Sequence, residues 1–285
     1  MKTNFPLWRP RRWLSLSLVL GLGCGGVPGA LDSASDGQDL AAQARGWTRV
    51  YRHDFKDLHD VNRFESGKKD NDDAADLRKP TLNANVEVVK DAAAEDGYAI
   101  ATYTRQGTFQ TSAGAKVGWS NGRWQIDGQD MAPPLRIRTR IRTTASIETK
   151  SAVMFWPSGG GWSWEVDFLE TFGGSSLTQG SGARQTAGER WHFDKDGNGR
   201  ATEQMIKDFP LDTTRYHVYD LLIGRQTMTL LVDGVAQAAT TAAQQGMIPN
   251  GVGHFGIGKA LTGARDVPGR TEDALYVDWL ELYRR

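Results

Sequence analysis

Short stretches in which apolar and polar residues alternate, separated by turn residues, run through the chain from residue 47 onwards. From Leu135 to Arg142, Leu and Ile alternate with Arg and Thr, which is the pattern of a strand with one buried face. Val86 to Val89 and Tyr98 to Tyr103 predict a pair of strands joined around Asp96-Gly97. No long helical period and no internal repeat interrupts this pattern. We therefore predict one all-β domain over residues 47–285.

One predicted strand, from Trp164 to Phe172, combines a strand pattern with three acidic residues. Glu165 and Asp167 are two positions apart, so their side chains share one face. Glu170 lies at an odd offset and would face the other way in a regular strand. One extra residue, a β-bulge, would return Glu170 to the face of the other two acids. We predict that all three carboxyl groups line one surface, with the apolar residues between them in the core.

Glycoside hydrolysis is a reaction that requires such a group of carboxyl groups. A retaining glycosidase needs two carboxyl groups roughly 5 to 5.5 Å apart, one as nucleophile and one as acid/base. A third acid between them can hold a shared proton, and crowding separates the pKa values of neighbouring carboxyls. A solvated strand face is the alternative, but such faces usually mix charges. No Lys or Arg lies between Lys150 and Arg184, which favours a catalytic site.

The acidic segment and its surroundings resemble glycoside hydrolase family 16. The resemblance begins with Ser151–Pro157, continues through a loop rich in Gly, Ser and Trp, and reaches Trp164–Glu170. Tyr216–Ile223, followed by Thr229–Val235, resembles paired strands of the family that end in a Val-Asp-Gly hairpin. Tyr276–Tyr283 resembles the closing strand of the family domain. The order and spacing of these segments fit the family pattern along the whole predicted domain.

The resemblance implies a jelly-roll (concanavalin-like) β-sandwich with a concave substrate cleft. It implies that Glu165 is the nucleophile, that Asp167 assists it, and that Glu170 is the acid/base. The two residues between Asp167 and Glu170 resemble the bulged branch of the family, which includes laminarinase-like and agarase-like enzymes. The shorter E-x-D-x-E spacing is typical of the lichenase and xyloglucan branches.

Aromatic and histidine residues near the acids are the candidates for substrate binding. Trp156 and Trp162 flank the acidic strand and are predicted sugar platforms, because aromatic faces stack on sugar C–H surfaces. A core position is the alternative for each, and Trp164 should lie in the core because it adjoins Glu165. By resemblance to a histidine of the family, His192 is expected to face the cleft. The other histidines do not cluster at the spacing of metal ligands, and no metal site is predicted: His53, His59, His217 and His254.

Two acidic segments bear on calcium binding. Asp70–Asp73 reads as a solvated loop, with a contribution to a Ca²⁺ site as the alternative. Asp194 to Gly199 copies the start of an EF-hand loop, but Met205 stands where the loop needs Glu, so we predict a hairpin tip there. We expect no required cofactor, and a structural Ca²⁺ is left open by the family resemblance.

Charge and composition narrow the classes of partner. The chain has 34 basic and 34 acidic residues and a formal net charge of zero. This balance gives no reason to expect a nucleic acid or a membrane surface as partner. A neutral enzyme suits an uncharged polysaccharide, and we expect a monomer.

The N-terminal segment predicts export. Three arginines at positions 9–12 precede an apolar stretch from Trp13 to about Leu22, so residues 1–30 read as a signal peptide. The pair Arg11-Arg12 leaves a twin-arginine signal open. The apolar stretch is too short to span a membrane.

Cys24 is the single cysteine of the chain, which excludes an intramolecular disulfide. Its place just after the apolar stretch leaves two alternatives. A lipoprotein signal would end before Cys24 and anchor the protein through it, or Cys24 would be removed with the signal. Residues 31–46 are rich in Ala, Ser, Asp, Gly and Gln and read as a flexible linker.

These features predict a secreted, endo-acting, retaining β-glycanase. The expected substrate is a β-1,3-glucan or a mixed-linkage β-1,3/1,4-glucan, with a galactan such as agarose as the rival. A non-catalytic, lectin-like sandwich is the alternative from another class, because one fold serves many functions. A binding module needs the aromatic residues but not three acids, so the acids favour the enzyme. A cell-wall-anchored structural protein is a third interpretation, favoured if Cys24 is lipidated and the cleft is blocked.

Overall fold

The computed structural model describes residues 46–65, 80–110, 116–144, 149–159, 163–171, 186–193, 203–239, 248–261 and 271–285. These residues belong to the unit Gly46–Arg285. The predicted signal peptide, Cys24, Asp70–Asp73 and residues 194–199 lie outside the described residues, so their assignments stay predictions. Within the described part of the chain, we find no helix with the length and apolar character needed to cross a membrane.

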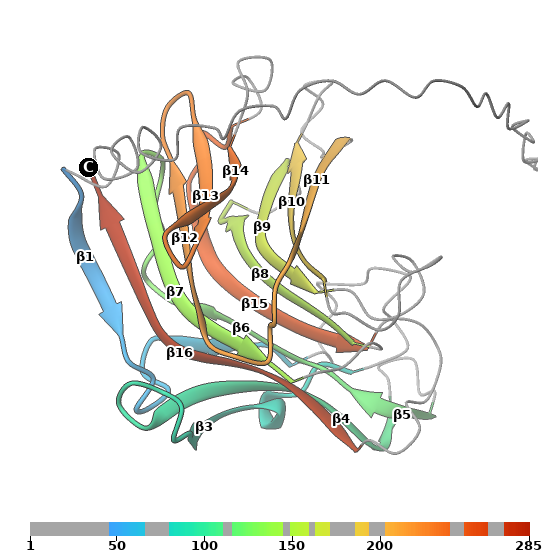
Figure 1. Cartoon of the computed structure of the whole chain (residues 1–285). Coiled ribbons are helices and arrows are strands. Elements are labelled where there is room, and N and C mark those ends of the chain that lie inside the picture. The colour runs from blue at the N-terminus through green and yellow to red at the C-terminus, as the bar shows by residue number, and fades with distance from the viewer. Residues whose placement is uncertain are drawn as a thin grey trace, which may run out of the picture. The chain divides into compact units, whose positions relative to one another are not determined.

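Antiparallel strands build two sheets (Figure 1). The nine-stranded sheet has the order β14-β13-β12-β7-β16-β4-β3, and two further strands, β1 and β5, pair with β16 and β4. Its strands are β1 Thr48–His53, β3 Val86–Lys90, β4 Tyr98–Gln110, β5 Lys116–Ser120, β7 Leu135–Thr143, β12 His217–Ile223, β13 Met228–Val232, β14 Val235–Ala239 and β16 Glu272–Arg284.

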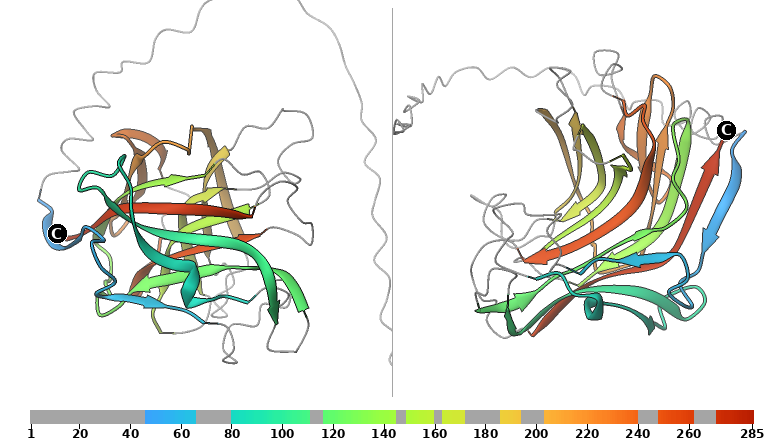
Figure 2. Two further views of the ribbon diagram at one scale, coloured as in Figure 1. Left: turned by 90° about the horizontal axis from the view of Figure 1, so that it is seen from below. Right: turned by 180° about the vertical axis from the view of Figure 1, so that it is seen from behind.

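The seven-stranded sheet has the order β11-β10-β9-β8-β15-β6-β2. Its strands are β2 Val61–Arg63, β6 Gly122–Ile126, β8 Thr149–Pro157, β9 Trp164–Thr171, β10 Thr186–Phe193, β11 Glu203–Pro210 and β15 Gly253–Leu261. This sheet bends strongly, and its hollow side faces away from the nine-stranded sheet (Figures 1 and 2). The prediction of an all-β jelly-roll sandwich is confirmed.

Several local predictions hold in the structure. β3 and β4 pair through the turn at Asp96-Gly97, where Gly97 has a φ of +76° that favours glycine. β10 and β11, the strands before and after the predicted hairpin tip, pair with each other, while the tip itself stays a prediction. β7 alternates between buried and half-exposed residues along its whole length, as its sequence pattern requires.

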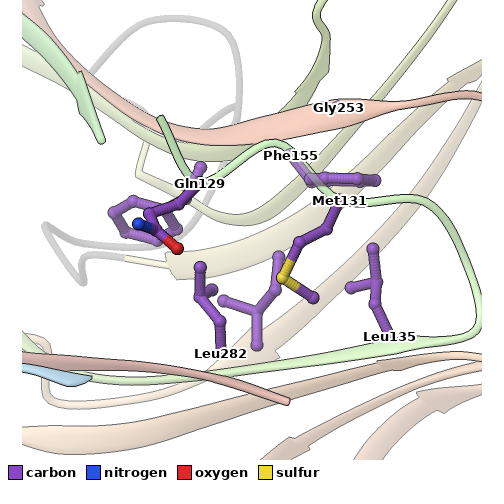
Figure 3. A pocket seen from close by; sticks show the side chains of 8 residues that line it. Gln129, Met131, Leu135, Phe155, Gly253 and Leu282 are labelled. Carbon is purple, nitrogen blue, oxygen red and sulfur yellow. The ribbon is translucent and has the colours of Figure 1, made fainter. Parts of the chain in front are cut away.

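The core lies between the two sheets and is almost wholly apolar. The bent sheet contributes fully buried rings of Phe155, Phe168 and Phe255, and the opposite sheet contributes aliphatic residues such as Leu221 and Leu280. A narrow crevice in this core, lined on one side by Met131, has no space for a water molecule (Figure 3). This crevice is therefore too small for a ligand.

The outer face of the nine-stranded sheet carries a network of arginines and carboxylates. Every second residue of β7 is an arginine that points outward, and each is ion-paired. Arg136 pairs with Asp220, Arg138 with Asp220 and Glu281, Arg140 with Asp278, and Arg142 with Asp91. Aromatic rings lie beneath the guanidinium groups, as at Tyr276, whose ring centre is 3.8 Å from Arg142 Cζ. The network is neutralised within itself, which assigns this face a structural role.

Glu281 connects four members of this face. It accepts hydrogen bonds from Arg49 at 2.7 Å, Arg52 at 2.8 Å, Arg138 at 3.1 Å and the Tyr283 hydroxyl at 2.6 Å. Burial of the side chain would by itself raise its pKa. The hydrogen bonds from Tyr283, Arg49 and Arg52 outweigh that effect and lower the pKa of Glu281 to about 2.

We expect Glu281→Gln to lower the free energy of unfolding at pH 7 by about 1–3 kcal/mol. Because the folded pKa is depressed, the stabilisation is complete above the unfolded pKa, near 4.5, and is lost as the pH falls towards about 2. Urea unfolding of both proteins between pH 7 and pH 2 measures the difference. A difference that stays constant over this range would contradict the assignment to the Glu281 carboxylate.

Candidate active site

The acidic strand β9 contains the predicted bulge, and both neighbouring strands show it. Along β8, Met154 stands opposite Asp167 and the next residue, Val153, stands opposite Leu169. The register therefore skips one residue of β9. The same shift occurs against β10. Its residues 190 and 188 stand opposite Asp167 and Glu170, so two steps along β10 match three steps along β9. β9 is one residue longer than either neighbour at this place, and the prediction of a bulge is confirmed.

The bulge decides which way the acids face. Asp167 stands opposite Met154 and Glu170 opposite Ala152, and these partners are two residues apart on β8, so they share a face. Phe168 and Leu169 are both fully buried in the core on the other side. Glu170 is therefore returned to the face of Asp167, and Glu165 lies two residues before Asp167 on that same face. The three acids lie on the hollow side of the bent sheet.

The three carboxyl groups are well shielded from water. Glu165 is 8% exposed, while Asp167 and Glu170 are each 1% exposed. Like charges at such depth are unfavourable unless protons or partners compensate them, because burial penalises the charged form. A buried group of acids on one face is suited to proton transfer, and it is hard to explain as a solvated surface.

His192 joins this group from the next strand. It stands opposite Glu165 on β10, and its Nε2 lies 3.8 Å from Asp167 Oδ2. Glu165, Asp167 and His192 each offer one ligand atom within 4.8 Å of the others, which is the geometry of a candidate cation site. Ca²⁺ takes six to eight oxygen ligands, so two carboxylates and an imidazole suit it poorly. At 3.8 Å from Asp167, His192 is close enough to act on that carboxyl through its charge when the ring is protonated.

The predicted sugar platforms have different outcomes. Trp156 is half-buried on β8 and, two residues beyond Met154, lies on the face of the acids. Trp162 lies outside the described residues, so its role stays a prediction. Trp164 belongs to the core, as expected, with its ring centre 5.0 Å from that of Phe155.

Beside the acids, the floor of the hollow face is built from small residues. Gly258 of β15 stands opposite Ala152, and Gly256 stands opposite Met154. A Cβ added at Gly258 would meet only Met154 Cε, at 3.9 Å, and one at Gly256 would have no contact shorter than 3.6 Å. There is room for a Cβ at both positions, so close packing does not explain why they are glycine. Because these two positions carry no side chain, the surface beside the acids is formed there by the backbone of β15.

Two residues on the same face were missed from the sequence, His254 and Arg123. His254 stands opposite Trp156, and the Arg123 guanidinium carbon lies 5.8 Å from the Trp156 ring centre. The alternation of side chains along a strand could have indicated their face. Phe255 and Trp124 are core residues, so the residues next to them in the chain face the other side of the sheet. Alternation does not say which strands are adjacent, so the cluster itself was not predictable.

Comparisons with known proteins agree on the architecture. No protein-family model and no curated protein matches this chain. Among solved structures, LamAcat from Zobellia galactanivorans is 14% identical, covers 86% of this chain and 99% of its own, and has a TM-score of 0.66. The endo-β-1,3-glucanase from Pyrococcus furiosus is 14% identical and covers 83% of this chain and 94% of its own, with a TM-score of 0.64. A glycoside hydrolase family 16 endo-glucanase from Bacteroides ovatus is 13% identical and covers 82% and 99%, with a TM-score of 0.64.

The chain has the fold of the family 16 glycoside hydrolases. The likeness extends over nearly the whole of each solved structure, so this is a match of whole domains. Within the family 16 fold of this chain, β9 has two strands on one side and four on the other. The acids thus lie well inside the bent sheet, with strands extending on both sides.

Proposed function

We propose that this protein is a secreted, retaining endo-β-glycanase that hydrolyses a polysaccharide. The observation that carries the proposal is the bulge in β9, which turns Glu165, Asp167 and Glu170 to one face. A binding module does not need three crowded, buried acids on its ligand face, since burying like charges together opposes stability. The fold, which is shared with glucan hydrolases, supports the same proposal.

The mechanism uses the roles that the family resemblance implies for the three acids. Glu165 attacks the anomeric carbon while Glu170 donates a proton to the departing glycosidic oxygen. A covalent glycosyl-enzyme forms on Glu165. Glu170, now ionised, takes a proton from water, which attacks the anomeric carbon and releases Glu165 with the β-configuration retained. Asp167, between them, orients Glu165 and holds a shared proton, with His192 3.8 Å away.

The proposed substrate is a β-1,3-glucan or a mixed-linkage β-1,3/1,4-glucan. The solved structure from Pyrococcus furiosus is named an endo-β-1,3-glucanase, and one from Bacteroides ovatus is named for mixed-linkage glucan. Endo action is supported by strands that extend on both sides of β9, which gives a long chain a surface on each side of the cleaved bond. The reaction needs no organic cofactor, and we propose that the protein acts as a monomer.

The experiment is release of reducing sugar from laminarin, lichenan, xyloglucan, agarose and carrageenan. Wild type, Glu165→Gln and a control, Glu272→Gln, are assayed in parallel. Glu272 lies at the start of β16 in the other sheet, with a side chain 55% exposed. We expect activity on a β-glucan in the wild type and the control and its loss in Glu165→Gln.

Proton NMR of the first product gives the stereochemistry, which is expected to be the β-anomer. Hydrolysis of agarose alone would assign a galactan substrate. Binding of a polymer by wild type and Glu165→Gln, with hydrolysis by neither, would overturn the enzymatic proposal in favour of a lectin-like module.

A further inference from the structure

A second polar cluster lies on the hollow face, beyond the acids. It consists of His254, Ser158, Trp156 and Arg123, and we call it the His254 cluster. β15 and β8 are neighbours, and β8 is in turn the neighbour of β9. His254 stands opposite Trp156, and Glu165 stands opposite His192. Phe155 pairs with Val166, so one residue further along both strands Trp156 and Glu165 fall in the same row across the sheet. The His254 cluster and the nucleophile therefore lie along one line that crosses the strands.

The His254 ring is held by its surroundings. The Ser158 hydroxyl and His254 Nδ1 share a hydrogen bond of 3.1 Å, and the Ser158 amide donates to the Val252 carbonyl at 3.0 Å. The preceding residue, Gly253, is closely packed, since a Cβ there would lie 2.5 Å from Trp164 and 2.6 Å from the Trp156 carbonyl. The backbone that carries His254 is therefore fixed, and so is one nitrogen of its ring.

The other nitrogen of the His254 ring is Nε2. Among the described residues, none hydrogen-bonds His254 Nε2. Burial lowers the pKa of His254 below its ordinary value of 6.5, Arg123 lowers it further, and Asp130 acts in the opposite direction. The ring is therefore neutral near pH 7. A neutral imidazole offers one donor and one acceptor, which suits a sugar hydroxyl better than a cation would.

We propose that His254 positions the glycan chain by hydrogen-bonding a sugar unit other than the one that Glu165 attacks, with that unit lying against Trp156. The strands β15 and β9 are two places apart, which separates His254 from the nucleophile by roughly 10 Å. That separation places the two contacts on different units of one bound chain. β8 lies between β15 and β9, and its Trp156 stands opposite His254, so the Trp156 side chain lies between the two contacts. This inference rests on the proposed function.

The alternative is purely structural, with the His254–Ser158 bond only tying the end of β8 to β15. The two differ in their dependence on substrate length. A positioning contact acts only on substrates long enough to reach it, whereas a structural bond affects all substrates alike. Aryl β-glycosides that carry one to five sugar units, together with the polymer, separate the two cases.

We expect His254→Ala to raise KM about five- to tenfold for the longest glycosides, as the loss of one hydrogen bond implies, with kcat within about twofold. The one-unit glycoside should show no change. His254→Gln keeps a donor and an acceptor and should recover most of the affinity. Ser158→Ala leaves the imidazole in place and should show a smaller rise in KM. An equal change for short and long glycosides, or a loss of thermal stability alone, would overturn the proposal.

The pH dependence gives a second readout. We assign the tautomer in which Nδ1–H donates to Ser158, so that Nε2 is the acceptor for a sugar hydroxyl. KM of the wild type for long glycosides should then rise at a pH below 6.5, because protonation removes that acceptor. His254→Gln should lack this rise. Arg123, Asp130, Glu165 and His192 are the charged or titratable groups near this line of the face, and all of them are present in both proteins. Their titration therefore cancels in the comparison.

The inference can be tested apart from catalysis. Calorimetric binding of unmodified oligosaccharides to Glu165→Gln and to the double variant Glu165→Gln/His254→Ala needs no turnover. Weaker binding of long but not short oligosaccharides by the double variant supports the His254 contact, even if the wild type hydrolyses none of them. Equal affinities in an active enzyme would overturn the inference and leave the proposed function intact.

Discussion

Glu165→Gln and Glu170→Gln should each reduce kcat/KM on a β-glucan by about 10⁴- to 10⁶-fold, the range expected when a residue of a concerted catalytic group is removed. Each substitution leaves the fold intact, because the amide is isosteric with the carboxyl. Removing one of three crowded acids also relieves like-charge repulsion, so the midpoint of thermal unfolding should stay the same or rise. Assays beside the Glu272→Gln control measure both effects.

Rescue by azide distinguishes the two roles. In Glu165→Ala, azide occupies the space of the nucleophile and attacks an activated aryl glycoside directly, which gives the α-glycosyl azide. In Glu170→Ala, Glu165 still forms the glycosyl-enzyme and azide replaces water in the second step, which gives the β-glycosyl azide. The reverse pair of anomers would exchange the two assignments. If azide rescued neither variant and either variant kept its activity without azide, the roles assigned to Glu165 and Glu170 would be wrong.

Trp124→Ala should cost more stability than any other single change considered for this protein. Trp124 is fully buried on β6, with its ring centre 5.3 Å from that of Phe55 and 5.8 Å from that of Phe255. Its Nε1 donates a 2.7 Å hydrogen bond to Thr102 Oγ1 on β4, which connects the two sheets. We expect a loss of about 4–5 kcal/mol from the cavity and the broken bond. That loss corresponds to a fall of about 10–15 °C in the thermal midpoint.

Two further variants separate packing from the hydrogen bond. Trp124→Phe keeps most of the buried ring and should cost about 1–3 kcal/mol, largely because Thr102 loses its partner. Combined with Thr102→Val, the second substitution should add little, and this coupling measures the bond. If Trp124→Phe is as damaging as Trp124→Ala, the ring contributes its energy through the hydrogen bond, and the packing explanation is wrong.

Features that depend on a single strand, such as which side chains face the core, are predicted well from the sequence. Alternation in β7 correctly indicates which residues enter the core, and the odd spacing of Glu170 correctly indicates a bulge. The prediction of the bulge needs a chemical argument as well as a pattern. Only the requirement that three acids share a face makes an extra residue the expected solution.

What the sequence could not supply is the adjacency of distant strands. His254 and Trp156 lie far apart in the chain and become neighbours only because β15 pairs with β8. In the same way, alternation places the arginines of β7 outward but does not identify Asp220 or Glu281 as their partners. A period of two fixes the face of a residue, whereas the order of strands in a sheet comes from long-range packing.

The bulge also makes one point of β9 tolerant to a change in chain length. If either Phe168 or Leu169 were deleted, the strand would become a regular pleat against both neighbours, and Asp167 and Glu170 would still share a face. Deletion of Val166 would instead make Glu165 and Asp167 adjacent and turn one of them into the core. A related protein can therefore lack one residue at the bulge and still have all three carboxyl groups on one face. The loss of a residue elsewhere between the acids would turn a carboxyl group to the other face. Two sequences that differ there by a gap can carry the same arrangement of acids.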